Sequence, residues 1–242
     1  MEALVVEIEN LKKSFGTNMV LKDINLNIER GKNMVVLGKS GSGKSVLIKC
    51  LVGLLEPDAG KVVILGKEIT KLENKELNIL RKRVGFLFQS AALYDSMTVR
   101  ENLEFPLRDL KKKKQEEIDS LVTETLKSVG LEDAIDKMPS ELSGGMRKRV
   151  GLARTLILKP EIILYDEPTT GLDPITSKEI SQLILDIQKK YNATSIIITH
   201  DVECARITAN RMVVIKDGEC IAEGTFKELS ESEDEWIRSF FK

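Results

Sequence analysis

A glycine-rich segment near residue 40 carries the residue types that bind phosphate. It matches the pattern Gly-x-x-x-x-Gly-Lys-Ser and contains Gly38, Lys39, Ser40, Gly41, Ser42, Gly43, Lys44 and Ser45. Its glycines allow successive N–H groups to point at phosphate oxygens, and the start of a following helix adds positive potential. We expect Lys44 to contact the β- and γ-phosphates of a nucleotide and Ser45 to ligate Mg²⁺. The alternative is a glycine-rich turn with a chance Lys-Ser pair.

Two adjacent carboxylates follow a second apolar segment. Residues 162–165 are Ile-Ile-Leu-Tyr, and Asp166 and Glu167 come directly after them. A buried strand here would place both acids at the carboxyl edge of a parallel sheet, where ligands bind. We expect Asp166 to act on Mg²⁺ through water, and Glu167, pointing the other way along an extended chain, to orient or deprotonate the attacking water. The alternative is a strand that simply ends before Pro168.

A third motif could bind a second anion. Ser143, Gly144 and Gly145 precede a segment with helical spacing that runs to Leu156. Serine at the N-cap would leave glycine N–H groups exposed at the positive end of the helix. The alternative is a helix cap with no ligand.

Hydrophobic spacing predicts the elements that position these motifs. Two antiparallel strands are expected within the first 30 residues, and further strands at 34–37, 62–65, 84–88, 162–165, 194–199 and 212–215. Helices are expected at 46–55, 98–107, 116–129, 177–191 and 202–208. Because strands and helices alternate after residue 160, we expect an α/β fold with a doubly wound, mainly parallel sheet.

The same spacing predicts one domain over residues 1–242. Residues 1–89 and 158–242 would form its core with an antiparallel β part, and about 90–157 an inserted helical part. Near the end, Trp236, Ile237, Phe240 and Phe241 are spaced for one helical face, which we expect to pack on the sheet rather than on a partner. The lysine run at 111–114 is interpreted as a solvated helix start or, alternatively, as a contact for anionic lipid headgroups.

Composition excludes several classes of protein. The 37 basic and 38 acidic residues nearly cancel, which argues against a nucleic-acid partner. Three cysteines without metal-ligand spacing indicate reduced thiols. The first residues lack the pattern of a signal peptide, and no stretch approaches the roughly 20 apolar residues that cross a bilayer. We therefore expect another chain to provide any attachment to a membrane.

Taken together, these motifs resemble the nucleotide-binding domain of the ABC family, a P-loop NTPase fold. Outside the three motifs above, the resemblance includes Gln89, the segment Gly171-Leu172-Asp173-Pro174 and His200, the sole histidine. It implies that two copies pair head to tail around two ATP molecules, each held between one subunit's phosphate loop and the Ser143-Gly144-Gly145 segment of the other. ATP and Mg²⁺ are the expected cofactors.

The resemblance also assigns roles to single residues. It implies that Gln89 contacts Mg²⁺ and water while its loop senses a membrane partner, and that His200 contacts the γ-phosphate. Phe15 would stack on adenine, unless it is a core side chain. Val46 would belong to the nucleotide-binding set, and Asp173 would communicate between the two ATP sites.

Three stretches are similar to a narrower group, the ATPases of MCE-type (Mla) phospholipid transporters. The similarity lies in residues 87–108, 138–149 and 173–176. It implies peripheral attachment to the cytoplasmic face of the inner membrane, two permease subunits, an MCE-type lipid-binding protein and lipid movement between two membranes. An ABC ATPase serving another substrate and a soluble nucleotide-gated clamp are the alternatives.

Overall fold

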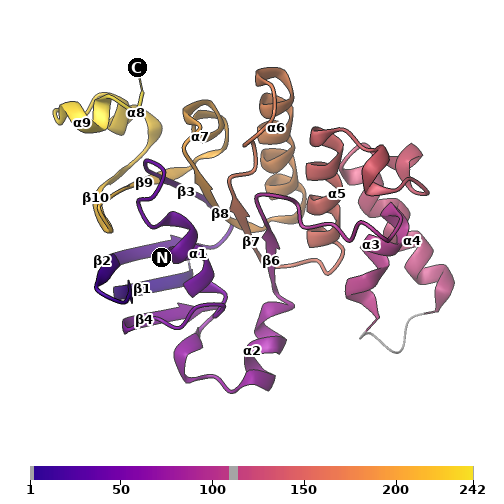
Figure 1. Cartoon of the computed structure of the whole chain (residues 1–242), viewed down its shortest axis with the longest axis horizontal. Helices are drawn as coiled ribbons and strands as arrows, with labels where there is room; N and C mark the ends of the chain where they lie inside the picture. The colour runs from indigo at the N-terminus through magenta and orange to yellow at the C-terminus, as the bar shows by residue number, and fades with distance from the viewer. Residues whose placement is uncertain (1–2, 109–113, 242) are drawn as a thin grey trace.

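The computed structural model describes residues 3–108 and 114–241, and its strands form one curled sheet (Figure 1). Residues 111–113 of the lysine run lie outside these ranges. The strands in the described ranges are β1 (Leu4–Phe15), β2 (Asn18–Glu29), β3 (Asn33–Leu37), β4 (Ala59–Ile64), β5 (Lys67–Glu68), β6 (Val84–Leu87), β7 (Ile162–Asp166), β8 (Thr194–Thr199), β9 (Arg211–Lys216) and β10 (Glu219–Gly224). They are ordered β5-β4-β1-β2-β10-β9-β3-β8-β7-β6.

The sheet has a parallel and an antiparallel part. Strands β9, β3, β8, β7 and β6 pair in parallel, whereas β1 pairs antiparallel with both β2 and β4. Strand β10 joins the parts, because it is antiparallel to β9 and pairs with β2 at Glu219 and Asp23. The expected mixed, mainly parallel core sheet with an antiparallel part is confirmed.

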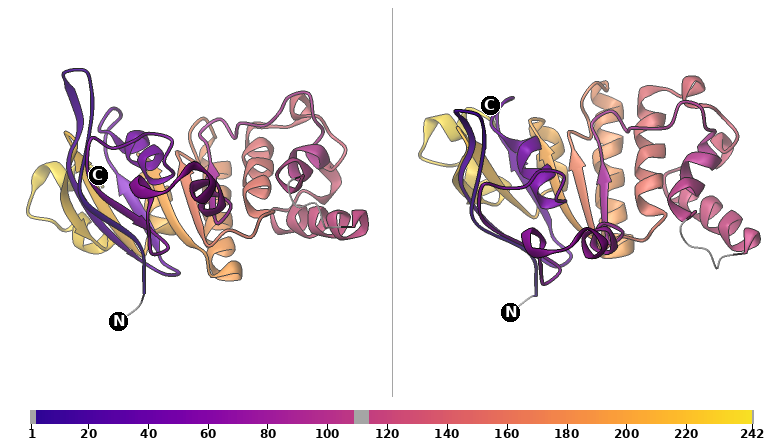
Figure 2. Two further views of the ribbon diagram at one scale, coloured as in Figure 1. Left: turned by 90° about the horizontal axis from the view of Figure 1, so that it is seen from below. Right: turned by 60° about the horizontal axis from the view of Figure 1, so that its bottom comes forward.

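Helices cover the sheet and form a separate block at one end. They are α1 (Lys44–Leu51), α2 (Asn74–Arg81), α3 (Val99–Glu104), α4 (Gln115–Ser128), α5 (Gly144–Leu156), α6 (Pro174–Tyr191), α7 (Val202–Thr208), α8 (Phe226–Ser230) and α9 (Glu235–Arg238). In every view α3, α4 and α5 lie together at the end opposite β1, β2 and β4 (Figure 2). The domain limits at 90 and 157 stay a prediction.

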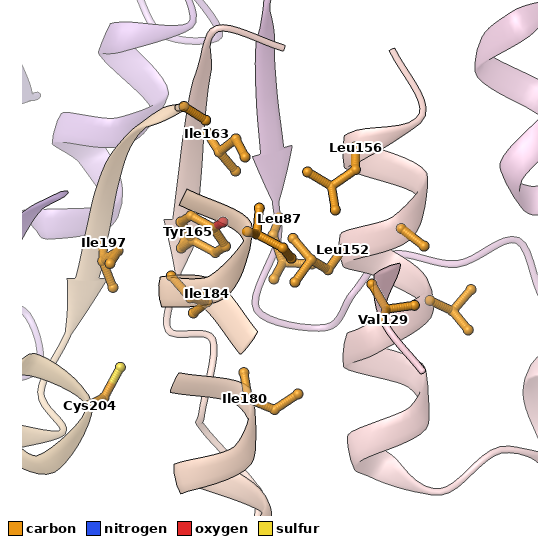
Figure 3. Close-up of a cluster of buried hydrophobic side chains, with 14 of the residues drawn as sticks. Leu87, Val129, Leu152, Leu156, Ile163, Tyr165, Ile180, Ile184, Ile197 and Cys204 are labelled. Atoms are coloured by element: carbon orange, nitrogen blue, oxygen red, sulfur yellow. The ribbon is translucent and has the colours of Figure 1, made fainter. Parts of the chain in front are cut away.

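The parallel strands are buried on both faces, so the side chains of neighbouring residues pack into two different cores. In β7, Ile163 and Tyr165 join the core that contains α5 and α6, while Ile162 and Leu164 join the core around α1. Figure 3 shows Leu152 and Leu156 of α5 reaching toward Leu87 at the sheet edge. This packing ties the helical block to the strands that carry the catalytic motifs.

Several elements differ from the expectation. Helix α1 begins at Lys44 and ends at Leu51, not at residue 55, because Gly53 has a φ of 66° and breaks the helix. The 98–107 helix stops at Glu104, and a 3₁₀ turn containing Pro106 follows it. Strands β5 and β10 and helices α2 and α8 were missed. The predicted C-terminal helical face is wrong in extent, since α9 has four residues and Phe240 and Phe241 follow it.

Candidate nucleotide-binding site

The glycine-rich segment forms a loop between β3 and α1, as its spacing predicted. Gly43 is the N-cap of α1 with a φ of 98°, a conformation that favours glycine. A Cβ there would lie 2.9 Å from the carbonyl oxygen of Val20. The hydroxyl of Ser42 is buried and has no hydrogen-bond partner among the described residues. The loop therefore holds a polar group that a phosphate oxygen could satisfy.

Lys44 is folded back onto its own loop. Its Nζ donates to the carbonyl oxygens of Gly38 at 2.7 Å and Lys39 at 3.1 Å, and it lies 3.8 Å from Glu167 Oε1. The side chain is only 6% exposed. Burial lowers the pKa of Lys44, and the Glu167 and Asp166 carboxylates oppose that shift. The ammonium is thus held at the mouth of the loop.

Asp166 ends β7 next to the first turn of α1. Its Oδ1 accepts a hydrogen bond from Ser45 Oγ at 3.1 Å. Burial raises the pKa of Asp166 above its usual value, and the hydrogen bond from Ser45 opposes that shift. Carboxylate and hydroxyl oxygens are ligands that Mg²⁺ prefers, directly or through water. The pair therefore fits the expected Mg²⁺ site.

Glu167 is not in the extended conformation that we expected. Its φ is 49°, in the left-handed region, which costs a residue with a side chain about 1–3 kcal/mol. The turn directs its carboxylate toward the next strand end, where Oε2 lies 2.8 Å from His200 Nδ1 and accepts a hydrogen bond from Thr170 Oγ1 at 3.2 Å. The side chains of Glu167, Thr170 and His200 thus converge at the ends of β7 and β8.

A pocket of about 690 Å³ brings most of the predicted residues together. Among the predicted residues, its lining contains Lys39, Ser40, Gly41, Gly43, Lys44, Ser45, Val46, Gln89, Glu167 and His200. Val20, Thr170 and Phe240 also line it and were missed. Thr170 lies three residues after Glu167, a local signal that could have found it. Phe240 follows the last recognised motif by 40 residues, so only the fold reveals it.

Other predicted residues lie outside this pocket. Ser143 caps α5 and accepts a hydrogen bond from the Met146 N–H at 3.2 Å, leaving an exposed helix start. Asp173 caps α6 and accepts from the backbone of Ile175 and Thr176. Phe15 is 48% exposed, and Lys13 Nζ lies 5.7 Å from its ring. The adenine contact of Phe15 and the cross-dimer roles of Ser143 and Asp173 stay predictions.

Comparisons with known proteins show the family of the chain. A family model described as ABC transporter matches residues 21–170. The probable ribonucleotide transport ATP-binding protein mkl of Mycobacterium leprae is 44% identical over 98% of this chain and 68% of its own length. The intermembrane phospholipid transport ATP-binding protein MlaF of Haemophilus influenzae is 39% identical over 100% of this chain and 92% of its own length. The methionine import ATP-binding protein MetN of Rhizobium johnstonii is 41% identical over 91% and 60%, respectively.

A solved structure also matches most of the chain. The dimeric post-hydrolysis state of an ATP-binding cassette bound to ADP and Pi has a TM-score of 0.83 and 35% identity, covering 91% of this chain and 98% of that chain. The fold thus agrees with the solved cassette. The chain belongs to the ABC transporter family, as an ATP-binding subunit that hydrolyses ATP.

Proposed function

We propose that this chain powers the movement of phospholipid between two membranes by hydrolysing ATP beneath a partner permease. The convergence of Lys44, Glu167 and His200 on one pocket carries the hydrolytic part. The lipid part is supported by similarity to the MlaF protein of Haemophilus influenzae along the whole chain. The assembly that this proposal implies is an MCE-type transporter, a group whose ATPases the sequence resembles.

The phosphate loop and Lys44 bind the triphosphate. Lys44 Nζ donates to two loop carbonyls, and phosphate oxygens would replace those acceptors. Ser45 and Asp166 would hold Mg²⁺, with Gln89 at the pocket wall as a further contact. The ion would neutralise charge on the phosphates. The chain's own polar groups would orient and deprotonate the attacking water.

Glu167 orients the attacking water and accepts its proton. Its carboxylate is anchored by His200 and Thr170 on one oxygen, and the other oxygen faces Lys44. A carboxylate fixed in this way loses less rotamer freedom when the water binds. His200 would contact the γ-phosphate with its free ring edge, since its side chain is 59% exposed and lines the pocket.

A second copy completes the site. The N-terminus of α5, where Ser143 and Gly144 are exposed and Gly145 is buried, would face the nucleotide of the partner subunit, as in a head-to-tail dimer. The dimeric cassette with bound ADP and Pi supports this arrangement. In the described ranges, no helix has the length and hydropathy of a membrane span. We propose peripheral attachment to the cytoplasmic face of the inner membrane through permease subunits and an MCE-type protein.

The test is purification of the chain from its native membrane in mild detergent. Co-purifying proteins and lipids are identified, and ATP turnover is compared between the wild type and Glu167→Gln. We expect a permease, an MCE-type protein and bound phospholipid, with turnover lost in the variant. An amino-acid permease, as the methionine-import relative would suggest, would retain the ATPase and overturn the lipid assignment. Recovery without any membrane partner would favour a nucleotide-gated clamp.

A further inference from the structure

One face of α5 contacts two loops that border the catalytic site, the loop of residues 89–92 and the turn at Glu167. Lys148, Gly151 and Arg154 are spaced three residues apart, so they lie along the same side of the helix. The Lys148 ammonium donates to the carbonyl oxygens of Gln89 and Glu167, the latter at 3.2 Å. Arg154 donates to the carbonyl oxygens of Ala92 at 2.8 Å and Ala91 at 3.1 Å. A Cβ on Gly151 would lie 2.9 Å from that of Ala91.

Lys148 occupies an unusual environment for a lysine. It is 6% exposed, and burial lowers its pKa, opposed by the Glu167 and Asp166 carboxylates. Buried ammonium groups are rare unless their hydrogens are accepted by oxygens. Here two of the three hydrogens go to backbone carbonyls of different loops. The side chain therefore connects the Gln89 loop, the Glu167 turn and the helix that Ser143 begins.

Both loops have backbone conformations that require support. Glu167 has a φ of 49°, and Ala91 and Ala92 have φ values of 60° and 48°. Residues with side chains adopt the left-handed region only where their surroundings hold them. The carbonyls of all three accept hydrogen bonds from the cations of α5. Helix α5 thus holds the strained turn that aims the Glu167 carboxylate.

We propose that Lys148 is a positioning residue for hydrolysis, which locks the Glu167 turn and the Gln89 loop to α5. When the start of α5 moves, Lys148 carries that movement to the backbone of Glu167 within the same subunit. ATP binding depends mainly on the phosphate loop, so loss of the Lys148 contacts should slow ATP turnover more than it weakens ATP binding. The inference rests on the ATPase site and is independent of the substrate carried by the permease.

The test compares variants in the full chain within its purified membrane complex. Lys148→Met keeps the length of the side chain and removes its hydrogen-bond donors, whereas Lys148→Gln restores an amide with two hydrogens. Lys127→Met removes an exposed lysine from α4 and serves as the control. We expect Lys148→Met to lower kcat by about tenfold to a hundredfold, since small misplacements of a catalytic group cost that much. ATP affinity should stay within about threefold of the wild type, and Lys148→Gln should recover part of kcat.

A double variant separates positioning from a structural role. If Lys148 acts through Glu167, adding Lys148→Met to Glu167→Gln should not further reduce the single-turnover rate, because the group being positioned is already lost. An additive loss, or equal losses of ATP affinity and kcat that Lys148→Gln does not relieve, would overturn the proposal. So would wild-type kcat in Lys148→Met. Loss of turnover in Glu167→Gln, measured in the same assay, tests the ATPase role separately.

Discussion

Asp166 and Glu167 are neighbours in the chain but experience different surroundings. Asp166 ends a buried strand, is 7% exposed and accepts a hydrogen bond from the hydroxyl of Ser45. Glu167 turns away in a left-handed conformation and gains two side-chain partners. A one-residue change in backbone direction thus separates a group suited to hold a cation from one suited to orient water.

The burial of Asp166 predicts opposite effects of one substitution on stability and on activity. Since the folded-state pKa is raised above its ordinary value of 3.8, the folded chain binds a proton more readily than the unfolded chain. The cost in stability therefore grows as the pH rises from 3.8 and is complete above the folded pKa. We expect Asp166→Asn to raise the urea midpoint of the nucleotide-free chain at pH 7, while ATP turnover falls more than about tenfold through loss of the Mg²⁺ contact.

Urea unfolding at several pH values checks the sign. The gain over the wild type should shrink as the pH falls from the folded pKa toward and below 3.8, where Asp166 is protonated in both states. Asparagine keeps an oxygen that can accept from Ser45, so this hydrogen bond does not confuse the comparison. A variant that is less stable than the wild type at pH 7 would contradict the prediction.

At the scale of elements, the C-terminal segment is attached to the phosphate loop. The Trp236 ring lies 5.7 Å from Lys39 Nζ and 4.5 Å from Lys216 Nζ. Phe240 packs edge-on against Trp236 at 4.8 Å and lines the nucleotide pocket. A nucleotide in the pocket would therefore contact Lys39 and Phe240, which both contact the Trp236 indole.

This packing predicts that tryptophan emission reports nucleotide binding. Trp236 is the sole tryptophan, so the whole signal arises at one position. We expect a saturable change in emission on adding ATP, because a bound phosphate draws Lys39 from the ring and alters the field at the indole. Its midpoint should equal the dissociation constant from calorimetry. Lys44→Ala, which weakens phosphate binding, should shift both midpoints together, and an unchanged emission spectrum at saturation would contradict the prediction.

Local signals explain which elements the sequence could predict. Strands β7 and β8 and helix α7 follow from continuous apolar runs and periodic spacing, and Ser143 was correctly predicted as a cap. Strand β10 was missed because its burial alternates weakly and its place is fixed by pairing with β9. The turn at Glu167 was also missed, since its φ depends on two distant partners. The Glu167 carbonyl accepts a hydrogen bond from Lys148, and the Glu167 N–H donates to the carbonyl of Ile198.

At the scale of the whole molecule, the candidate site is divided between two surfaces. The phosphate loop follows β3, Asp166 ends β7 and Glu167 comes directly after it, whereas Ser143 caps α5. Helix α5 belongs to the helical block (Figure 2). Gly145 is packed so closely on α6 that a Cβ would lie 2.5 Å from Thr176 Cγ2. The start of α5 is therefore fixed to the helix that Asp173 caps, and both face outward as one surface.

This division predicts association that depends on ATP. In Glu167→Gln, ATP binds and is hydrolysed only very slowly, so bound ATP persists. We expect light scattering to show a doubling of mass when ATP is added and none with ADP, because only the γ-phosphate reaches the partner's helix start. Ser143→Arg in the same background should remain monomeric while its ATP affinity in the monomer stays within about threefold of the parent, since Ser143 lies outside the chain's own pocket. Lys127→Met should dimerise like the parent. If Ser143→Arg dimerised equally well, the two copies would have to pair through another surface, and the helix start of α5 would have no anion to bind.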